Sequence, residues 1–288
     1  MKEQEYKIEN IKSFELADIF ECGQCFRWNK QEDGSYTGVF KGNVMNVQKH
    51  GDTVTFKGIC NGNIKEIVED YFDLKRDYEE IKSKLEKIDD NVKTSIQYGK
   101  GIRILNQDLW EMIISYIISA NNNIPRIKGV IERISKNYGK EIEFQGEKYY
   151  TFPSLEELKD VTVEEYRKLG AGFRDIRLYE TVHMLLDKKV DLDEMQKNPN
   201  TMEVREQLLT LSGVGPKVAD CILLFSTLKR FEVFPIDVWV RRVMNELYIK
   251  NEDETKINKK EIEKLAQEKF GKLAGIAQQY LFYWKREA

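Results

Sequence analysis

The chain has 288 residues, 41% of them hydrophobic and 33% charged, with a formal net charge of −3. This length allows a large core with two or three subdomains, and the composition is typical of a globular protein. The lack of any run of about 18 apolar residues argues against a membrane span, and four scattered cysteines argue against a disulfide scaffold. The N-terminal sequence has no apolar signal core, so we expect a cytoplasmic protein.

Residues 1–95 are predicted to form an antiparallel sheet domain with helices on one side. Residues 35–40, 44–49 and 53–57 are short runs rich in Val, Phe, Tyr and Thr, which are typical of strands. Turn residues separate them at 41–43 and 51–52. A helix over residues 64–72 and charged helical segments to about residue 93 follow. The helix-rich sequence after this sheet predicts an α+β fold.

The segment CGQCFRW, residues 22–28, lies within the sheet domain. Its C-x-x-C spacing suggests a metal or redox site, but no second pair of Cys or His is available to complete one. A core strand that buries Phe26 and Trp28 is the plainer alternative.

Residues 96–288 are predicted to form a helical region. Apolar residues at helical spacing between 110 and 118 indicate a buried helix, which ends in three asparagines followed by Ile-Pro-Arg. These asparagines fit a simple capping turn or a rigid corner that holds polar groups. A second amphipathic helix runs through residue 138, and residues 140–160 are expected to be a loop.

A helix over residues 163–169 leads into the sequence GAGFR, residues 170–174. The glycines permit a tight turn that we expect to expose both Phe173 and Arg174. An exposed aromatic beside an arginine suits insertion into a base stack. The alternative is an ordinary joint between helices with Phe173 in the core. Residues 175–187 form the next predicted helix.

Two helices, at about 204–228, flank the sequence SGVGP. Gly213 and Gly215 allow a positive φ and a close backbone approach, and Val214 between them is expected to plug the helix pair. Pro216 suits the first turn of the second helix. The N–H groups of this turn can hold a phosphate, as in a helix-hairpin-helix that grips a nucleic-acid backbone. An ordinary tight turn is the alternative.

Lys217 and Asp237 are the candidate catalytic pair. Lys217 stands at the positive end of a helix, where the dipole and burial favour a neutral, nucleophilic amine able to attack a sugar C1′. Asp237 follows Phe234-Pro235-Ile236 and is placed to cap the next helix. A fixed carboxylate near C1′ can stabilise an oxocarbenium ion. The alternatives are a phosphate contact for Lys217 and a cap alone for Asp237.

The runs LSGVGPKVADC and VFPID, with the flanking motifs, resemble the 8-oxoguanine DNA glycosylases of the helix-hairpin-helix/Gly-Pro-Asp superfamily. The resemblance implies that Lys217 is the nucleophile and Asp237 the catalytic carboxylate. It also implies that the Gly23 carbonyl accepts the N7 proton of 8-oxoguanine, a proton that guanine lacks. Asn121, Arg126 and Arg174 would contact the orphan cytosine, and Phe173, a tyrosine in animal members, would act as the wedge.

The last helices are expected at residues 237–247, 259–270 and 273–284. In the final one, Gln278 and Phe282 share a face at i, i+4. The resemblance assigns Gln278 to the Watson–Crick edge of the base and Phe282 to stacking on its ring, with Cys221 as the other wall. The alternatives are solvent for Gln278 and core packing for Phe282 and Cys221.

The resemblance also bears on ions and on the phosphate contacts. A monovalent or calcium ion can bind the backbone carbonyls of Leu209, Leu211 and Val214, whereas no cysteine follows Cys221 to support an iron–sulfur cluster. No redox cofactor is needed. Trp239 replaces a histidine of the eukaryotic members, which removes one expected phosphate contact. With a net charge of −3, basic residues must gather locally, and those expected near the site are Arg126, Arg174, Lys217, Lys229, Arg230, Arg241 and Arg242.

The predicted function is excision of 8-oxoguanine, preferably opposite cytosine, through a lysine Schiff base, followed by β-elimination. The partner is double-stranded DNA that contains 8-oxoguanine, and a monomer is expected. The Gly213-Val214-Gly215 turn and Arg241 would contact the DNA backbone. Two alternatives stay open: a monofunctional glycosylase for alkylated bases, and a non-catalytic DNA-binding protein that uses the hairpin alone.

Overall fold

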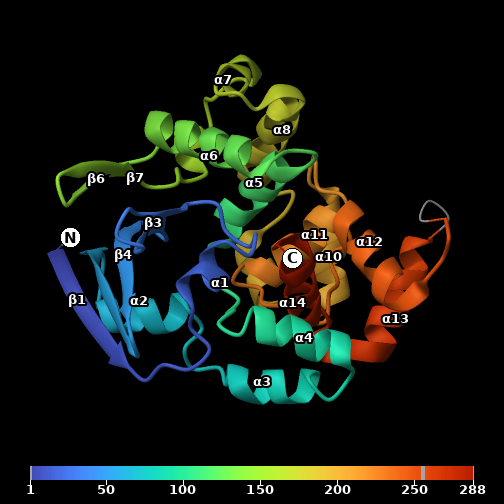
Figure 1. Cartoon of the computed structure of the whole chain (residues 1–288). Coiled ribbons are helices and arrows are strands. Elements are labelled where there is room, and N and C mark those ends of the chain that lie inside the picture. The colour runs from blue at the N-terminus through green and yellow to red at the C-terminus, as the bar shows by residue number, and fades with distance from the viewer. Residues whose placement is uncertain (1, 254–256, 288) are drawn as a thin grey trace.

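The computed structural model describes residues 2–253 and 257–287 of the chain. A sheet occupies one side of the molecule and helices make up the rest, with α14 (Ala274–Glu287) near the centre (Figure 1). This arrangement confirms the predicted α+β class. In the described part of the chain, no helix combines the length and apolar character that crossing a membrane requires.

The sheet has five antiparallel strands in the order β1-β5-β4-β3-β2. Their bounds are β1 Lys2–Glu9, β2 Trp28–Lys30, β3 Tyr36–Phe40, β4 Asn43–His50 and β5 Thr53–Cys60. The predicted strands correspond to β3, β4 and β5. Strand β1 was missed, because its sequence KEQEYKIE carries only two apolar residues among charged ones.

Each face of the sheet has its own apolar cluster, as the alternation of side chains along a strand requires. On one face, Val54, Phe56 and Met45 pack with α1 (Leu16–Phe20) and α2 (Ile64–Tyr71). On the other face, Val44 and Val39 pack with a small hairpin of β6 (Glu141–Phe144) and β7 (Glu147–Tyr150).

The β6–β7 hairpin corrects the expectation of a loop over residues 140–160. Gln145 and Gly146, with φ of 53° and 80°, form the tight turn that joins the two strands. The strands contain four Glu and Lys residues that disfavour β structure. Burial of Ile142 and Phe144 against the sheet compensates for this weak local preference.

The helical region follows the predicted order closely. Its elements are α3 Tyr78–Leu85, α4 Asp90–Tyr98, α5 Leu109–Ser119, α6 Ile124–Tyr138, η1 Glu156–Leu158, α7 Val163–Lys168, η2 Gly172–Arg174, α8 Asp175–Leu186, α9 Leu192–Lys197, α10 Thr201–Thr210, α11 Pro216–Phe225, α12 Val238–Met244, η3 Asn245–Ile249, α13 Lys259–Phe270, η5 Gly271–Leu273 and α14. Helix α5 is buried along almost its whole length and packs against α6, α8 and α11. It is therefore the central support of the site.

Candidate active site and DNA-binding surface

The turn between α10 and α11 has the geometry of a helix-hairpin-helix. Gly213 has a φ of 82°, and a Cβ there would lie 2.9 Å from the Arg177 side chain, so both conformation and space require glycine. Val214 is buried, as predicted for a plug. Gly215 differs from expectation, since its φ is −92°, but nothing lies within 4 Å of where its Cβ would be.

Helix α8 holds this turn in place. The Thr181 hydroxyl donates to the Ser212 carbonyl at 2.9 Å, and the Ser212 hydroxyl donates to Glu180 at 2.5 Å. The open space at Gly215 lies directly before the N-terminus of α11, where backbone N–H groups have no intrahelical acceptor. The turn therefore offers an anion such as a phosphate an approach to these groups.

Lys217 and Asp237 face one cavity from two different elements. Lys217 is half-buried at the second residue of α11, with its Nζ 5.6 Å from the ring centroid of Tyr116. The carboxylate of Asp237 caps α12 by accepting the Val240 N–H at 2.8 Å. This cap fixes the carboxylate, and it leaves the side chain on the wall of the cavity that Lys217 lines.

The cavity brings together residues that are far apart in sequence. All the predicted catalytic and base-pocket residues line it: Gly23, Lys217, Cys221, Asp237, Gln278 and Phe282. Five further residues complete the lining, namely Tyr116, Phe225, Pro235, Val240 and Gln279. Its volume is about 60 Å³, well below the range of sites for small organic ligands. A purine can enter only if side chains such as the half-buried Phe282 move.

Gln278 is the polar group of the cavity without a partner. Its side chain is 5% exposed, which excludes the solvent-facing alternative, and its Oε1 has no hydrogen-bond partner among the described residues. An unsatisfied buried amide oxygen costs stability. A ligand that donates a hydrogen bond would satisfy it.

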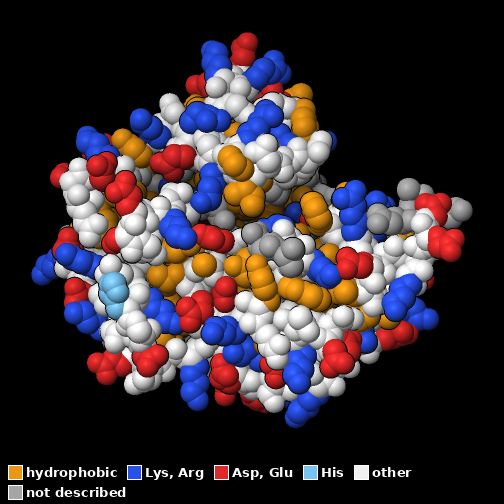
Figure 2. Space-filling view, viewed as in Figure 1, with side chains coloured by type: hydrophobic (Ala, Val, Ile, Leu, Met, Phe, Trp, Pro, Cys, Tyr) orange, Lys and Arg blue, Asp and Glu red, His pale blue; other side chains and the backbone are white. Residues whose placement is uncertain are grey.

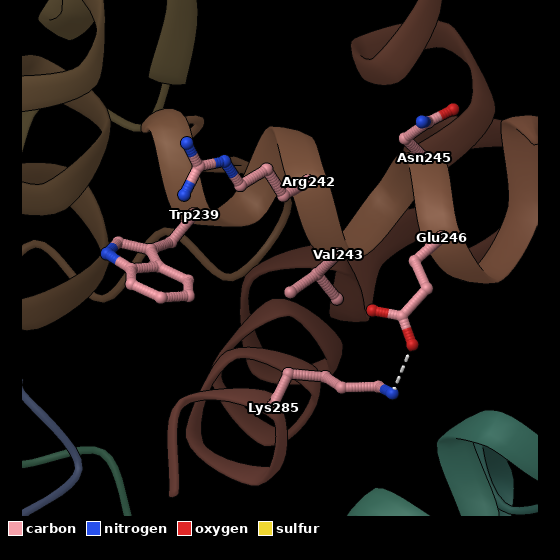
Figure 3. A pocket seen from close by; sticks show the side chains of 6 residues that line it. All are labelled: Trp239, Arg242, Val243, Asn245, Glu246 and Lys285. Atoms are coloured by element: carbon pink, nitrogen blue, oxygen red, sulfur yellow. Dashed lines mark hydrogen bonds and ion pairs between the residues drawn. The ribbon is translucent and has the colours of Figure 1, made fainter. Parts of the chain in front are cut away.

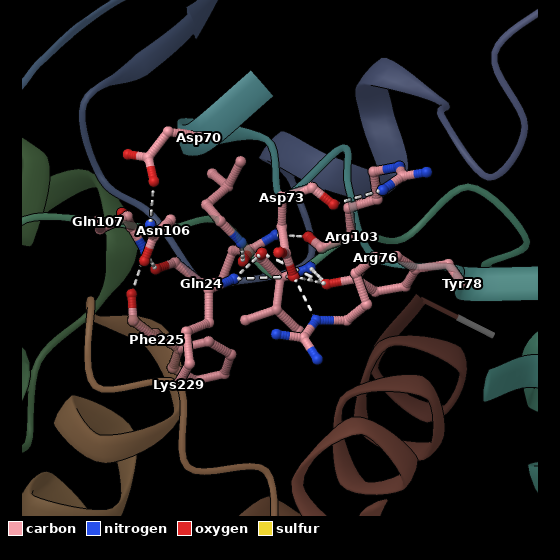
Figure 4. A network of polar contacts seen from close by, with 12 residues as sticks. Gln24, Asp70, Asp73, Arg76, Tyr78, Arg103, Asn106, Gln107, Phe225 and Lys229 are labelled. Atoms are coloured by element: carbon pink, nitrogen blue, oxygen red, sulfur yellow. Dashed lines mark hydrogen bonds and ion pairs between the residues drawn. The ribbon is translucent and has the colours of Figure 1, made fainter. Parts of the chain in front are cut away.

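Gly23 forms the opposite wall, in a conformation with a φ of 90°. Its position is fixed by the buried side chain of the next residue, Gln24. The Gln24 amide donates to the Arg103 carbonyl at 2.7 Å and accepts the Leu105 N–H at 2.9 Å (Figure 4). On the other side, Gln279 donates to the Cys22 carbonyl at 2.6 Å.

Cys221 lies on the cavity wall as a small apolar group. Burial raises the pKa of its thiol to about 11, against the opposing effect of the nearby Lys217 charge. The thiol is therefore neutral near pH 7. In the described part of the chain, no three His, Cys, Asp or Glu side chains are grouped to bind a metal, and Cys22, Cys25, Cys60 and Cys221 are buried free thiols.

A second group of predicted residues meets at the start of α6. Asn121 is exposed and has a φ of 50°, a conformation that is uncommon for residues other than glycine and concentrates at functional sites. Asn123 caps α6 by accepting the Arg126 N–H at 3.0 Å. Arg126 is exposed and reaches the neighbouring turn, where a Cβ on Gly172 would lie 3.2 Å from its guanidinium.

The two candidate residues in the turn at residues 170–174, Phe173 and Arg174, differ in their solvent exposure. Phe173 is 56% exposed, which excludes the alternative of a core side chain. The expectation that Arg174 is exposed is wrong, because only 1% of it is accessible. Its guanidinium donates to the Ala120 and Asn121 carbonyls at 2.9 and 2.7 Å. Arg174 therefore supports the turn at residues 120–123, the asparagine turn. Its contact with cytosine stays a prediction.

Not all the basic residues expected near the site belong to it. Lys229 lies 3.4 Å from the Asp73 carboxylate and donates to the Ile104 carbonyl (Figure 4). Arg230 donates to the Asn198 carbonyl at 2.5 Å. Both side chains therefore stabilise contacts within the fold. The expectation that they belong to a basic surface near the site is wrong. Arg241 is half-buried and Arg242 is exposed, both on α12.

The surface around the cavity is hollowed between the helices α6–α8 and the helix α12. Figure 2 shows hydrophobic and Lys or Arg side chains on both sides of this hollow. Phe173 and Ile124, which is 41% exposed, lie on one side, and Val238 and Trp239 on the other are 54% and 52% exposed. Exposed apolar groups beside cations suit contact with the bases and phosphates of DNA.

Sequence reasoning missed Gln24, Tyr116 and Gln279. Gln24 and Gln279 are adjacent to residues that were identified, so only their contacts distinguish them. Tyr116 looked like one of the buried residues of α5, and its hydroxyl donates to the Gln24 carbonyl at 3.2 Å. No local sequence pattern predicts hydrogen bonds between residues so far apart in the chain.

Two family models together match residues 7–272 of the chain. Residues 7–113 match the family model of the N-terminal domain of 8-oxoguanine DNA glycosylase. Residues 114–272 match that of the HhH-GPD superfamily base excision DNA repair proteins. A probable N-glycosylase/DNA lyase of Methanothermobacter thermautotrophicus is 34% identical, over 78% of this chain and 76% of its own length.

Two further similarities cover nearly the whole chain. An N-glycosylase/DNA lyase of Arabidopsis thaliana is 31% identical over 93% of this chain and 76% of its own length. The second similarity is to Clostridium acetobutylicum 8-oxoguanine glycosylase/lyase, whose sequence is 43% identical. Its crystal structure is a complex with double-stranded DNA containing cytosine opposite 8-oxoguanine. It superposes with a TM-score of 0.92 and covers 100% of this chain and 98% of that one.

Proposed function

Because the chain belongs to the HhH-GPD superfamily of base excision DNA repair proteins and has the N-terminal domain of the 8-oxoguanine DNA glycosylases, we propose that Lys217 is the nucleophile of its reaction. The protein is an 8-oxoguanine DNA glycosylase and lyase that acts on double-stranded DNA. The observation that supports the assignment of Lys217 most strongly is the cavity that it shares with Asp237, Gly23 and Gln278.

In the proposed reaction, a neutral Lys217 amine attacks C1′ of the extruded nucleotide. The bond from Nζ to C1′ forms as the bond from C1′ to N9 breaks, and the base leaves with a proton. The Asp237 carboxylate stabilises the positive charge that develops on the sugar. Opening of the sugar gives an iminium. Loss of a C2′ proton then breaks the C3′–O bond and nicks the strand.

Base recognition rests on three sides of the cavity. We assign the N7–H of 8-oxoguanine to the Gly23 carbonyl, and the Watson–Crick edge to the Gln278 amide. Phe282 and Cys221 face the two sides of the ring. The positive φ of Gly23 and the unpartnered Oε1 of Gln278 support this assignment, since both are features that a bound base would use.

The DNA is held outside the cavity by two separate contacts. The N–H groups of Gly213 and Gly215 would bind a phosphate, with Arg241 on a second one. Val214, also expected to contact the DNA backbone, uses its N–H inside the hairpin. A monovalent or calcium ion fits the carbonyls of Leu209, Leu211 and Val214, because such ions prefer oxygen ligands. The Leu211 carbonyl already accepts the Val214 N–H at 3.1 Å and keeps one lone pair for an ion.

The residues near the start of α6 would act at the gap that the extruded base leaves in the duplex. Phe173 would fill the stack, while Asn121, Arg126 and Arg174 would face the orphan cytosine and favour it over adenine. The exposure of Phe173 and the left-handed conformation of Asn121 support this role. We expect the enzyme to act as a monomer in the cytoplasm.

A nicking assay on three matched duplexes tests the proposal. The duplexes are undamaged, contain an alkylated purine, or contain 8-oxoguanine opposite cytosine. We expect strand cleavage only with 8-oxoguanine. Excision of the alkylated base without nicking would favour a monofunctional glycosylase, and binding without any reaction would favour a DNA-binding protein.

A further inference from the structure

The proposed reaction leaves a second cavity beside the active site without a role. Trp239 stands at the second residue of α12, two residues after Asp237, and its side chain is 52% exposed. The neighbouring Val238 is 54% exposed, and adjoining exposed apolar side chains indicate an interaction site more strongly than a single one does. Asp237 caps the same end of α12, so the two residues lie within one helical turn, although side chains two residues apart point to different sides of a helix.

The indole forms one wall of a cavity of about 410 Å³ between α12, η3 and α14 (Figure 3). The lining residues are Trp239, Arg242, Val243, Asn245, Glu246 and Lys285. This volume is within the range of sites for small organic ligands. The cavity that holds Lys217 is far smaller, so this second cavity can accept a planar group without rearrangement.

Its chemistry combines an apolar wall with cations at the rim. Trp239 and the buried Val243 supply the apolar surface. The guanidinium of Arg242 lies 5.6 Å from the centroid of the indole. Lys285 forms an ion pair with Glu246 at 2.5 Å across the cavity (Figure 3). The aromatic face suits a nucleobase and the Arg242 guanidinium suits a phosphate beside it, whereas Glu246 balances the charge of Lys285.

The second cavity adjoins the proposed base pocket through a layer of packed side chains. Val243 lines both it and a small apolar space whose other walls include Gln278 and Phe282. Only these side chains separate the two cavities. A DNA strand with one nucleotide in the Lys217 cavity therefore places the next nucleotide of the same strand near Trp239, whereas Phe173 and Arg126 belong to the far side of the hollow.

We propose that the Trp239 cavity binds the nucleotide next to the lesion on the damaged strand, with its base stacked on the indole. This inference rests on the proposed function, because it requires a lesion extruded toward Lys217. Extrusion and kinking unstack the neighbouring base. The indole then replaces the lost stacking partner, which stabilises the extruded state without reading the sequence.

The test uses Lys217→Gln protein, which binds the duplex without reacting, and a duplex with 8-oxoguanine opposite cytosine. 2-Aminopurine replaces the base on either side of the lesion, or a base in the opposite strand as a control. Its fluorescence should change on binding at one neighbouring position of the damaged strand, and Trp239→Ala should remove that change. Trp239→Phe keeps an aromatic ring and should retain most of it.

Affinity gives a second measurement. Trp239→Ala should weaken binding about tenfold, which corresponds to 1.4 kcal/mol, and Trp239→Phe less than threefold. DNA binding should quench tryptophan emission, and Trp239→Phe should remove most of that quenching. Trp110→Phe is the matched control, because Trp110 lies on α5 and donates to the Pro153 carbonyl at 2.9 Å. Trp239 is exposed, so we expect both of its variants to fold.

Two failures are distinguishable. Without the proposed function, the protein would not prefer the 8-oxoguanine duplex and no lesion-dependent signal would arise. If the preference persists, but Trp239→Ala changes neither the affinity nor the 2-aminopurine signal, the cavity assignment is wrong. The cavity assignment would also be wrong if DNA quenched the tryptophan emission of Trp239→Phe as strongly as that of the unsubstituted protein.

Discussion

Gln278 of α14 and Lys217 of α11 line the same cavity, although they come from different ends of the helical region. One offers an amide oxygen without a hydrogen-bond partner among the described residues, and the other an amine. The proposed recognition of the base and the proposed attack on its sugar would thus occur within one small space. The two tasks can be separated by substitution.

Gln278→Ala should reduce kcat/KM for 8-oxoguanine excision by about 10- to 100-fold, because a hydrogen-bonded base edge loses its partner. Cleavage of a duplex with an abasic site should change little, since that substrate has no base to recognise. Single-turnover nicking of both duplexes measures the two effects. An equal loss on both would show that Gln278 acts on structure or on Lys217 instead.

Gly23→Ala should reduce stability and abolish selective excision. The residue has a φ of 90°, and a Cβ would lie 2.9 Å from the Arg286 guanidinium and 3.5 Å from the Phe282 ring. The strain should cost about 1–3 kcal/mol. Gly34→Ala is the matched control, since Gly34 has a φ of 81° with nothing within 4 Å. Denaturant unfolding should show a similar backbone cost in both variants, and only Gly23→Ala should lose activity.

Arg174→Gln and Arg126→Gln should both weaken the preference for cytosine opposite the lesion, but only the first should destabilise the protein. Arg174 is buried and holds two carbonyls of the asparagine turn, so its loss should cost about 1–3 kcal/mol. Arg126 is exposed, and its replacement should stay within about 0.5 kcal/mol. Excision opposite cytosine and adenine, with unfolding curves, checks both expectations. Equal excision opposite the two bases in the unsubstituted protein would contradict the assignment.

Lys229→Met should change how stability depends on pH. Burial lowers the pKa of Lys229 from 10.5 to about 8. Between these values the unfolded chain binds a proton that the folded chain does not, so stability rises with pH by up to about 1.4 kcal/mol per pH unit. Unfolding of the Met variant from pH 7.5 to 9.5 should lack this rise. Lys84→Met, at a side chain 61% exposed, should keep it.

The sequence was most informative where local signals coincide with function. Gly213, the proline before Lys217 and the cap at Asp237 are short patterns with a local geometric meaning, and the structure has that geometry, whereas Gly215 lacks the positive φ that was expected. The i, i+4 pair Gln278 and Phe282 likewise shares one helix face. Their roles in the reaction stay predictions.

The features that were missed depend on contacts between distant segments. Strand β1 and the β6–β7 hairpin are rich in Lys and Glu, and pairing with the rest of the fold overrides their local preference. Gln24 and Tyr116 are joined by a hydrogen bond across 92 residues. Arg174 looks like a surface arginine by sequence, but two carbonyls of the asparagine turn accept its hydrogen bonds in the interior.

Borohydride trapping tests the central assignment most directly. The protein is mixed with a duplex that carries 8-oxoguanine opposite cytosine, and the imine is reduced to a stable covalent complex. We predict a trapped species with the unsubstituted protein and none with Lys217→Gln, although this variant still binds the duplex. A trapped complex that persists in Lys217→Gln, or tight binding by the unsubstituted protein without any trapping, would contradict Lys217 as the nucleophile.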